Sequence, residues 1–552
     1  MIDTLAKPVR RKALGAFYTP DTAAGFMATW AIRSPQDSVV DPSSGGGVFL
    51  RAAAERLAAL GGNPSSQVWG VELDPSAHDH VRSAVARDYG LDPDKLVLGN
   101  FFDIAGRLGS RFDAVIGNPP YIRYQAFAGP DRLSARRELA KGAVELSELA
   151  SAWAPFVVRS TGLLRDGGRL AMVLPMELFH AGYAKRVLAH LAASFRAITL
   201  VTFKRRLFPD LSQDTLLLLA DGRSGAKAEL RVKEVEGLED LAKLGAAAGR
   251  VRGARRVSQD VLEGRARLLS YLLPPKARTL YDELRRSAAV VRVSSLADVG
   301  IGYVTGGNDF FHLSPADTVR HGVPPSVLRR AVFRGRAFAG TEFDECRWRE
   351  ASETGDAGYL LAIPPTHRLS EGLLDLVRDG EARGVHEAYK CRVRSPWFSV
   401  PHVHVPDAFL TYMSGLRPSL VVNRCDAVAP NTLHIVRMLP LACTGVWNMA
   451  LSWRSSLTQL SVEIEGHAMG GGLLKLEPGE AANVLVAKPG LSEPQARQTC
   501  ELVDTVSDRT TDEIATDVVD QKVLQDALGL STADCKVLRE AARQLRDRRY
   551  RR

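Results

Sequence analysis

The stretch that decides the fold covers residues 39–47 and reads VVDPSSGGG. Two β-branched residues before Asp41 predict a strand that ends in an acidic side chain, and the glycines behind it predict a turn that lets the backbone approach a ligand closely. A helix is expected next, and the N-terminus of a helix favours negatively charged ligand groups. Glycine turns also serve tight packing alone. The residues that this turn offers to a ligand are Asp41, Ser43, Gly45 and Gly47.

The same rhythm of short apolar runs and helix-like segments extends from about residue 38 to residue 219. It predicts a parallel sheet that is covered by helices on both faces. Residues 49–60 and 75–89 have the length and periodicity of helices. The expected strands are residues 38–40, 67–71, 96–98, 114–116, 170–174, 197–201 and 215–219.

The second expected strand ends at Glu72, about 30 residues after the first acidic position. An acidic residue at this place in a doubly wound sheet can accept two hydrogen bonds from a ribose diol. A solvated turn carboxylate is the alternative interpretation. The turn after Asp41 and the carboxylate of Glu72 together predict a nucleoside-containing ligand.

Asn118-Pro119-Pro120-Tyr121 follows the expected strand at 114–116, at the edge where open α/β sheets bind ligands. The prolines fix the backbone and donate no N–H. The Asn118 side-chain oxygen and the Pro119 carbonyl can therefore accept both hydrogen bonds of an NH2 group, which frees its lone pair for attack, while Tyr121 stacks on a flat ring. A plain Pro-Pro turn does not account for the register with the two earlier motifs.

With these motifs in this order, the chain resembles the γ-class amino-methyltransferases of DNA, of which the TaqI adenine methylase is the familiar member. The resemblance covers about residues 14 to 222 and begins with Gly15-Ala16-Phe17-Tyr18-Thr19-Pro20. It implies a class I methyltransferase domain, an α/β fold with a Rossmann-like doubly wound sheet, that uses S-adenosylmethionine. The implied reaction is methyl transfer to N6 of an adenine that is flipped out of double-stranded DNA.

The resemblance also implies roles for single residues. Thr19, Asp41 and the turn from Ser43 to Gly47 would hold the methionine end of the cofactor, and Glu72 would bind its ribose. Asn100 and Phe101 would flank its adenine, although the family usually has Asp where Asn100 stands, so we expect altered affinity and not lost binding. Phe208, in Arg206-Leu207-Phe208-Pro209, would stack on the target base opposite Tyr121. The implied catalytic set is Asn118, Pro119, Pro120, Tyr121 and Phe208.

The second half of the chain mixes short β-like runs with turns and resembles, more loosely, the target-recognition regions of larger modification methylases. Its glycine-rich patches lie at residues 302–308 and 470–472, and basic residues alternate with aromatic ones around them. Such clusters suit contacts to phosphates and bases, although scattered arginines usually form a solvated face. The candidate DNA contacts are Arg334, Arg336, Arg347, Arg394 and Trp397.

Four segments are expected along the chain. Residues 1–245 form the cofactor-binding catalytic domain, residues 246–285 a linker, residues 286–490 an α+β target-recognition domain, and residues 491–552 a helical region with a basic tail. The length of 552 residues agrees with two or more hydrophobic cores. Every recognisable cofactor or amine motif lies in the first of these segments.

Composition narrows the class of protein. The net charge of +9 makes a polyanion a plausible partner. Six cysteines without a C-x-x-C pair indicate reduced thiols and no zinc site. The start of the sequence lacks the apolar stretch of a secretory signal, and no run of about 18 apolar residues predicts a membrane span. We therefore expect a cytoplasmic monomer that needs no metal and binds double-stranded DNA.

The motifs leave alternatives open. The same four-residue signature occurs in methyltransferases that act on RNA or on protein glutamine, and a DNA-recognition subunit could retain an inactive cofactor fold. The size of the second half and the segment around Thr19 favour DNA as the substrate. The expected setting is a restriction-modification or related defence system, in which a restriction endonuclease acts on the same site without a stable complex.

Overall fold

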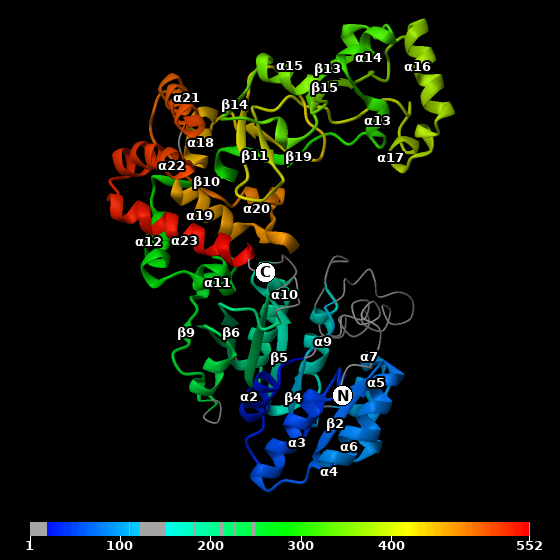
Figure 1. Ribbon diagram of the computed structural model, residues 1–552, viewed down its shortest axis with the longest axis vertical. Coiled ribbons are helices and arrows are strands. Elements are labelled where there is room, and N and C mark those ends of the chain that lie inside the picture. Colours follow the sequence, from blue (N-terminus) through cyan, green and yellow to red (C-terminus); the bar gives the residue numbers. More distant parts are fainter. Residues whose placement is uncertain are drawn as a thin grey trace. The chain divides into compact units, whose positions relative to one another are not determined.

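The structure is a computed structural model that describes residues 19–109, 111–121, 151–180, 184–208, 214–225, 228–245, 249–509 and 511–550 (Figure 1). The chain divides into two compact units at residues 272 and 273. Each unit has its own sheets and its own hydrophobic core. The two units are described separately below.

The first unit is built on a nine-stranded sheet with the order β3-β2-β1-β4-β5-β7-β6-β8-β9. Strands β1 to β5 are parallel, and β7 runs antiparallel between β5 and β6. All seven strands predicted from the sequence are confirmed, with bounds that differ by up to six residues. The prediction of a parallel sheet is wrong for its second half, because β7 lies between β5 and β6 and pairs antiparallel with both. The strands are β1 (Val39–Asp41), β2 (Val68–Glu72), β3 (Leu96–Leu98), β4 (Phe112–Gly117), β5 (Leu164–Pro175), β6 (Phe195–Phe203), β7 (Thr215–Arg223), β8 (Glu229–Val235) and β9 (Arg255–Arg256).

Helices cover both faces of this sheet, as the sequence predicts. Consecutive residues of β5 from Leu170 to Leu174 are all fully buried, which requires a packed layer on each side of the strand. Helix α2 packs on α3 against one face, and α7, α9 and α10 pack together on the other. Their bounds are α2 (Asp21–Ala31), α3 (Val48–Leu60), α7 (Phe101–Leu108), α9 (Trp153–Thr161) and α10 (Ala184–Ser194).

The strand order reverses between β1 and β4. The chain passes from β1 outward to β2 and β3, and then returns to place β4 on the other side of β1. Open α/β sheets bind ligands in the crevice outside the carboxyl ends of the strands at such a switch point. The two motifs that the sequence singles out therefore follow adjacent strands, β1 and β4.

Residues 246–285, which the sequence predicts to be a linker, are shared between the two units. Strand β9 pairs with β8 and extends the first sheet. Helix α12 (Pro275–Arg286) instead packs on α23 (Thr532–Tyr550) in the second unit. Strand β8 was not predicted, although its sequence ELRVKEV alternates apolar and polar residues as a half-buried strand does.

The second unit is α+β. Its largest sheet has the order β11-β19-β16-β18-β14, and small sheets join β12-β15-β13, β17-β21-β20 and β10-β22. The strand bounds are β10 (Val290–Arg292), β11 (Ala297–Ile301), β12 (His312–Leu313), β13 (Leu328–Val332), β14 (Glu342–Phe343), β15 (Ala357–Leu361), β16 (Ala408–Thr411), β17 (Met413–Ser414), β18 (Leu420–Asn423), β19 (Leu433–Met438), β20 (His467–Ala468), β21 (Leu474–Lys475) and β22 (Leu485–Ala487). The longer helices are α15 (Glu345–Glu353), α16 (Glu371–Ala382), α18 (Val446–Trp453), α19 (Ser456–Glu465), α21 (Glu493–Arg509) and α22 (Asp512–Asp520).

The C-terminal helices belong to the same packed body as the sheets of the second unit. Helix α23 lies along α19, and α21 along α18. A buried ion pair joins α23 to α19, because Arg549 Nε lies 3.0 Å from Glu463 Oε2 and both side chains are 3% exposed. No helix among the described residues is long and apolar enough to cross a membrane.

Candidate active site

Three neighbouring strand ends form the candidate site at the switch point. Strand β1 ends at Asp41, β2 ends at Glu72, and β4 ends at Gly117, directly before Asn118. The loop after β1 is fixed to β2 by a hydrogen bond from Ser44 N to the Val71 carbonyl, 2.9 Å long. The sheet therefore brings the cofactor turn and the proline turn to one place, although they lie some 75 residues apart.

Asp41 is fully buried at the base of the turn. The Ser43 N–H donates to Asp41 Oδ1 over 3.0 Å, while Oδ2 is buried without a hydrogen-bond partner in the described part of the chain. Burial raises the pKa of this carboxyl to about 8; the Glu72 carboxylate adds to the rise, and the Ser43 N–H opposes it. A buried acceptor of this kind suits a cationic ligand group, which would restore its charge.

Glu72 ties the turn to the end of β2. Its Oε2 accepts from Gly45 N at 2.7 Å, and its Oε1 accepts from Leu73 N at 2.9 Å and from Asp74 N at 2.8 Å. The carboxylate thus fixes the backbone on two sides. A carboxylate has about four acceptor sites. The three backbone contacts therefore leave one site, on Oε2, for a ribose hydroxyl.

Asn118 is held through both its main chain and its side chain. Ser43 Oγ donates to the Asn118 carbonyl oxygen over 3.0 Å. Asn118 Nδ2 donates to Thr19 Oγ1 over 3.2 Å. Thr19 is 5% exposed and directly precedes Pro20 and helix α2. Thr19 and Ser43, which the resemblance assigns to the cofactor, are therefore direct partners of Asn118.

Gly117 is a position in the candidate site that the sequence analysis did not single out. A Cβ at this residue would stand 2.8 Å from Asp41 Oδ1, closer than real Cβ atoms approach, and 3.2 Å from Pro42 Cδ, which is a tight contact. A side chain at residue 117 would therefore require Asp41 to shift where β4 passes the turn that follows β1. The signal in the sequence was a glycine between an apolar strand and Asn118.

Of the two aromatic residues predicted to hold the target base, Phe208 is buried and Tyr121 is partly exposed. Burial raises the pKa of the Tyr121 phenol well above its ordinary value. Phe208 is 7% exposed and belongs to the core that also contains Leu207 and Phe203. Residues 122–150 and 209–213, which follow these two rings, lie outside the described residues.

Asn100 and Phe101 have structural partners of their own. Asn100 is the N-cap of α7, and its Oδ1 accepts from Phe102 N over 2.9 Å. The Phe101 ring stacks on Phe156, with centroids 5.0 Å apart and planes inclined by 19°. The cap holds the start of α7 beside the end of β3, where the resemblance expects the cofactor adenine.

The candidate DNA contacts of the second unit differ in how free their side chains are. Arg336 Nε lies 2.7 Å from Asp356 Oδ1, and Arg334 lies 3.5 Å from the same oxygen, yet both side chains remain more than half exposed. Arg394 donates to the carbonyls of Thr305, at 2.6 Å, and Val304. It therefore supports the glycine-rich loop at residues 302–308.

Arg347 and Trp397 also differ in their surroundings. Trp397 donates from Nε1 to Glu381 Oε1 over 3.1 Å and packs on Phe310. Arg347 is 44% exposed, and its nearest carboxylate is Glu350 at 3.6 Å. Among these candidates, Arg347 therefore has the weakest contacts with other side chains. Trp397 is partly buried and packs against a hydrophobic core of the second unit.

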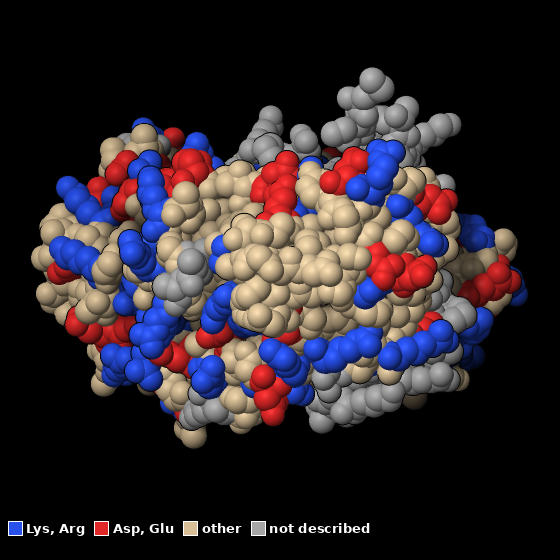
Figure 2. All heavy atoms as spheres, turned by 90° about the horizontal axis from the view of Figure 1, so that it is seen from below, with Lys and Arg blue, Asp and Glu red and all other residues tan. Residues whose placement is uncertain are grey.

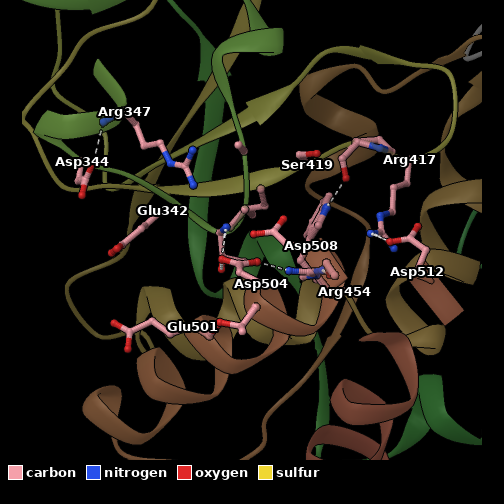
Figure 3. Close-up of a pocket in the computed structure, with 18 residues that line it drawn as sticks. Glu342, Asp344, Arg347, Arg417, Ser419, Arg454, Glu501, Asp504, Asp508 and Asp512 are labelled. Atoms are coloured by element: carbon pink, nitrogen blue, oxygen red, sulfur yellow. Dashed lines mark hydrogen bonds and ion pairs between the residues drawn. The ribbon is translucent and has the colours of Figure 1, made fainter. Parts of the chain in front are cut away.

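A polar cavity of about 480 Å³ lies in the second unit next to Arg347 (Figure 3). Arg454 pairs with Asp504, and Arg417 pairs with Asp512 across the cavity. The labelled lining residues include six carboxylates and three arginines: Glu342, Asp344, Glu501, Asp504, Asp508, Asp512, Arg347, Arg417 and Arg454. This acidic surplus makes the cavity an unfavourable place for a phosphate.

Charge on the surface is unevenly distributed. On the face shown in Figure 2, lysine and arginine side chains form a band along one margin of a broad uncharged area. Acidic side chains lie along other margins of the same area. Mixed charges of this kind do not by themselves identify a nucleic-acid interface. Within the described residues, no group of three or more His, Cys, Asp and Glu side chains is arranged to hold a metal ion.

Two different family models match the two parts of the chain, and the gap between the matches lies near the boundary between the two units. The family model described as N-6 DNA Methylase matches residues 2–234. The family model described as the C-terminal domain of the Type II methyltransferase M.Eco57I matches residues 265–524. The first match contains all the residues of the candidate site, and the second match begins beside the end of the first unit.

Two curated relatives align with most of the chain. The Type II methyltransferase M.AccI of Acinetobacter calcoaceticus is 21% identical over 497 residues, which are 88% of this chain and 87% of that protein. The Type II methyltransferase M.XamI of Xanthomonas campestris pv. amaranthicola is 23% identical over 481 residues, 85% and 84% of the two chains. Similarity therefore extends through both units.

Solved structures with a similar fold include the Type IIL restriction-modification enzyme MmeI and DrdV, both described as complexes with DNA. The Type IIL enzyme MmeI has a TM-score of 0.52 and 10% identity, with 99% of this chain and 80% of that chain covered. DrdV has a TM-score of 0.50 and 11% identity, with 91% and 58% covered. The predicted fold class, an α/β methyltransferase domain followed by a C-terminal domain, is confirmed.

Proposed function

We propose that this chain, which belongs to the N-6 DNA methylase family of restriction-modification systems, transfers a methyl group from S-adenosylmethionine to N6 of adenine at a specific site in double-stranded DNA. One observation carries the proposal: Asn118 and its proline turn lie at the switch point, joined by Ser43 to the loop that follows Asp41. The turn proposed to hold the cofactor and the turn proposed to accept the amine thus follow adjacent strands and are joined by a hydrogen bond.

The residues of the crevice fit S-adenosylmethionine. The buried Asp41 Oδ2 suits the ammonium end of the methionine moiety, because a cation nearby favours the ionised carboxylate. Glu72 at the end of β2 would accept from the ribose hydroxyls, and Asn100 and Phe101 at the start of α7 would lie beside the adenine. When bound, the cofactor supplies an electrophilic methyl group.

The chemistry of the chain itself lies in the Asn118 turn. Asn118 Oδ1 and the Pro119 carbonyl each accept one hydrogen bond from the two N–H groups of the exocyclic amine. Neither Pro119 nor Pro120 offers a competing backbone donor. The amine nitrogen then presents its lone pair to the methyl group. As the N–C bond forms, the sulfonium S–C bond would break to leave a neutral thioether, and the extra proton on the methylated nitrogen would leave to water. Catalysis therefore comes from positioning and from preorganised dipoles, and the turn needs no general base.

The target adenine must leave the duplex to reach this crevice. Tyr121 and Phe208 are proposed to hold the flipped base between their rings, and stacking of this kind contributes about 1 to 3 kcal/mol per base. The second unit is proposed to select the site, with Arg334, Arg336 and Arg347 as candidate phosphate contacts. A restriction endonuclease that cuts the same site would be the functional partner.

RNA or protein glutamine as the acceptor, or loss of catalysis, remains the alternative proposal. The second unit argues for DNA, because it matches the C-terminal domain of a Type II methyltransferase. The intact Asn118-Pro119-Pro120-Tyr121 argues for catalysis.

The test is methyl transfer from tritiated S-adenosylmethionine to duplex DNA, total RNA and a protein extract in parallel, with the methylated product identified by mass spectrometry. We expect N6-methyladenine in the duplex alone. Asn118→Ala should abolish the signal, while Asn63→Ala, at the start of α4 (Pro64–Gln67) and before β2, should not. Label in RNA or protein, or none in DNA, would overturn the proposal.

A further inference from the structure

We infer that Thr19 and Ser43 are positioning residues that orient Asn118 for methyl transfer, Thr19 through the side-chain amide and Ser43 through the main-chain carbonyl. The inference rests on the proposed function. It gives these two residues a task that the resemblance does not assign, since the resemblance places both at the methionine end of the cofactor.

The amide of an asparagine has two ends of similar shape and opposite hydrogen-bonding character. Only the Oδ1 end can accept a hydrogen bond from the target amine. Asn118 Nδ2 donates to Thr19 Oγ1 over 3.2 Å. Because Nδ2 is directed to Thr19, Oδ1 is the end presented elsewhere. An inverted amide would direct two N–H donors at an amine that is itself a donor.

Thr19 is well suited to orient the Asn118 amide, because its own position is fixed by helix α2, which follows it in the chain. It is 5% exposed and directly precedes Pro20, whose carbonyl accepts from Ala23 N at 2.9 Å and from Ala24 N at 3.1 Å at the start of α2. Helix α2 is buried along most of its length and packs on α3. The Thr19 hydroxyl is therefore carried by a packed helix.

Ser43 fixes the other end of the same residue. Its hydroxyl donates to the Asn118 carbonyl over 3.0 Å, and its own N–H donates to Asp41 Oδ1 over 3.0 Å. The next two residues of the turn, Pro119 and Pro120, have no N–H with which to anchor it. The carbonyl of Asn118 is thus an anchor point of the proline turn, and the cofactor loop holds it.

The two roles of Thr19 predict different kinetics. A residue that only binds cofactor raises its Kd and leaves the rate at saturation unchanged, whereas a residue that orients Asn118 lowers kcat at saturating cofactor. A displacement of about 1 Å in a catalytic group can reduce the rate by about 100-fold. Thr19→Val, which keeps the shape and removes the hydroxyl, separates the two roles.

The experiment compares the full-length wild type with Thr19→Val, Thr19→Ser and Ser43→Ala, measuring kcat on duplex DNA and the Kd of S-adenosylmethionine by calorimetry. We expect kcat to fall by roughly 10- to 100-fold in Thr19→Val, with Kd within about threefold, and Thr19→Ser to restore most of the rate. Ser43→Ala should also lower kcat. Thr161→Val is the matched control, because that buried hydroxyl donates to Val157 O within α9 and precedes β5. Its kcat should not change.

A raised Kd with unchanged kcat in Thr19→Val, or no effect on either, would overturn the inference. A second readout does not need activity: the side-chain amide signal of Asn118 in protein labelled with 15N-asparagine, identified by its loss in Asn118→Asp. It should shift in Thr19→Val and stay near the wild-type position in Thr19→Ser. If the wild type methylates no DNA, the proposed function fails, and this signal then tests only whether Thr19 orients the Asn118 amide; an unshifted signal in Thr19→Val rejects that orientation.

Discussion

Gly117 and Asp41 approach each other so closely that a Cβ on residue 117 would stand 2.8 Å from Asp41 Oδ1. Asp41 cannot move away easily, because it is fully buried and its Oδ1 accepts from the Ser43 N–H. The last residue of β4 and the last residue of β1 are thus matched in shape. The contact lies directly beside Asn118 and makes the site sensitive to a single methyl group.

Gly117→Ala should therefore destabilise the chain by about 1 to 3 kcal/mol, the usual cost of forcing an extra methyl into a packed site. It should also weaken cofactor binding, because Asp41 must shift. Denaturant unfolding and calorimetry measure the two effects. Gly25→Ala is the matched control, since nothing lies within 4 Å of a Cβ there and the residue is inside α2. Equal stability of the two variants would contradict the packing argument.

Asp41 should make stability depend on pH. Its folded pKa of about 8 lies above the ordinary value of 3.8, so between these values the folded chain holds a proton that the unfolded chain has released. The contribution of this carboxyl is fully present below about pH 4 and is lost as the pH rises through 8. Unfolding by denaturant at pH 5 and pH 8, without cofactor, should show wild type losing more stability than Asp41→Asn. Parallel pH profiles would contradict the assignment.

Asn100→Asp should preserve both the fold and cofactor binding. Aspartate is as good an N-cap as asparagine, and its charge is favourable at the N-terminus of α7. Asn100→Ala should instead cost about 1 kcal/mol through loss of the cap. Thermal unfolding with calorimetric titration of the cofactor distinguishes the two variants. A large loss of affinity in Asn100→Asp would show that the cofactor adenine lies elsewhere.

Arg347 and Arg394 should respond differently to substitution. Arg347→Gln removes an exposed cation, so it should weaken DNA binding for all sequences alike and reduce the slope of log K against log salt by about one. Arg394→Gln should mainly lower the unfolding temperature, because its guanidinium supports the carbonyls of Val304 and Thr305. Fluorescence anisotropy at several salt concentrations tests Arg347→Gln, and thermal unfolding tests Arg394→Gln. An unchanged slope in Arg347→Gln would remove it from the interface.

The sequence predicted the first unit well because its strands are short apolar runs with clear turn residues between them. It missed β8, whose alternation in ELRVKEV is a weaker signal than a continuous apolar run. It also gave no hint that Thr19 would contact Asn118, since 99 residues separate them and only the assembled sheet brings them together. The pair of Glu463 and Arg549 was hidden for the same reason.

The role of Asn100 as a helix N-cap was missed for a different reason. Its place before a helix was visible in the sequence, and an asparagine at that position is a strong N-cap signal. The resemblance drew attention to the cofactor instead. Arg394 was likewise grouped with surface arginines, because its burial against two carbonyls depends on a loop some 90 residues earlier in the chain.

We propose that Asn118 enables methylation of adenine N6 at a defined DNA sequence. The most direct measurement is long-read sequencing of genomic DNA from a methylation-free host that expresses either the full-length wild type or Asn118→Ala. The account predicts N6-methyladenine at one recurring sequence motif with the wild type and none with the variant, while both proteins bind S-adenosylmethionine within a few-fold of each other. Methylation that persists in Asn118→Ala, or that falls on cytosine or on no DNA base, would contradict it.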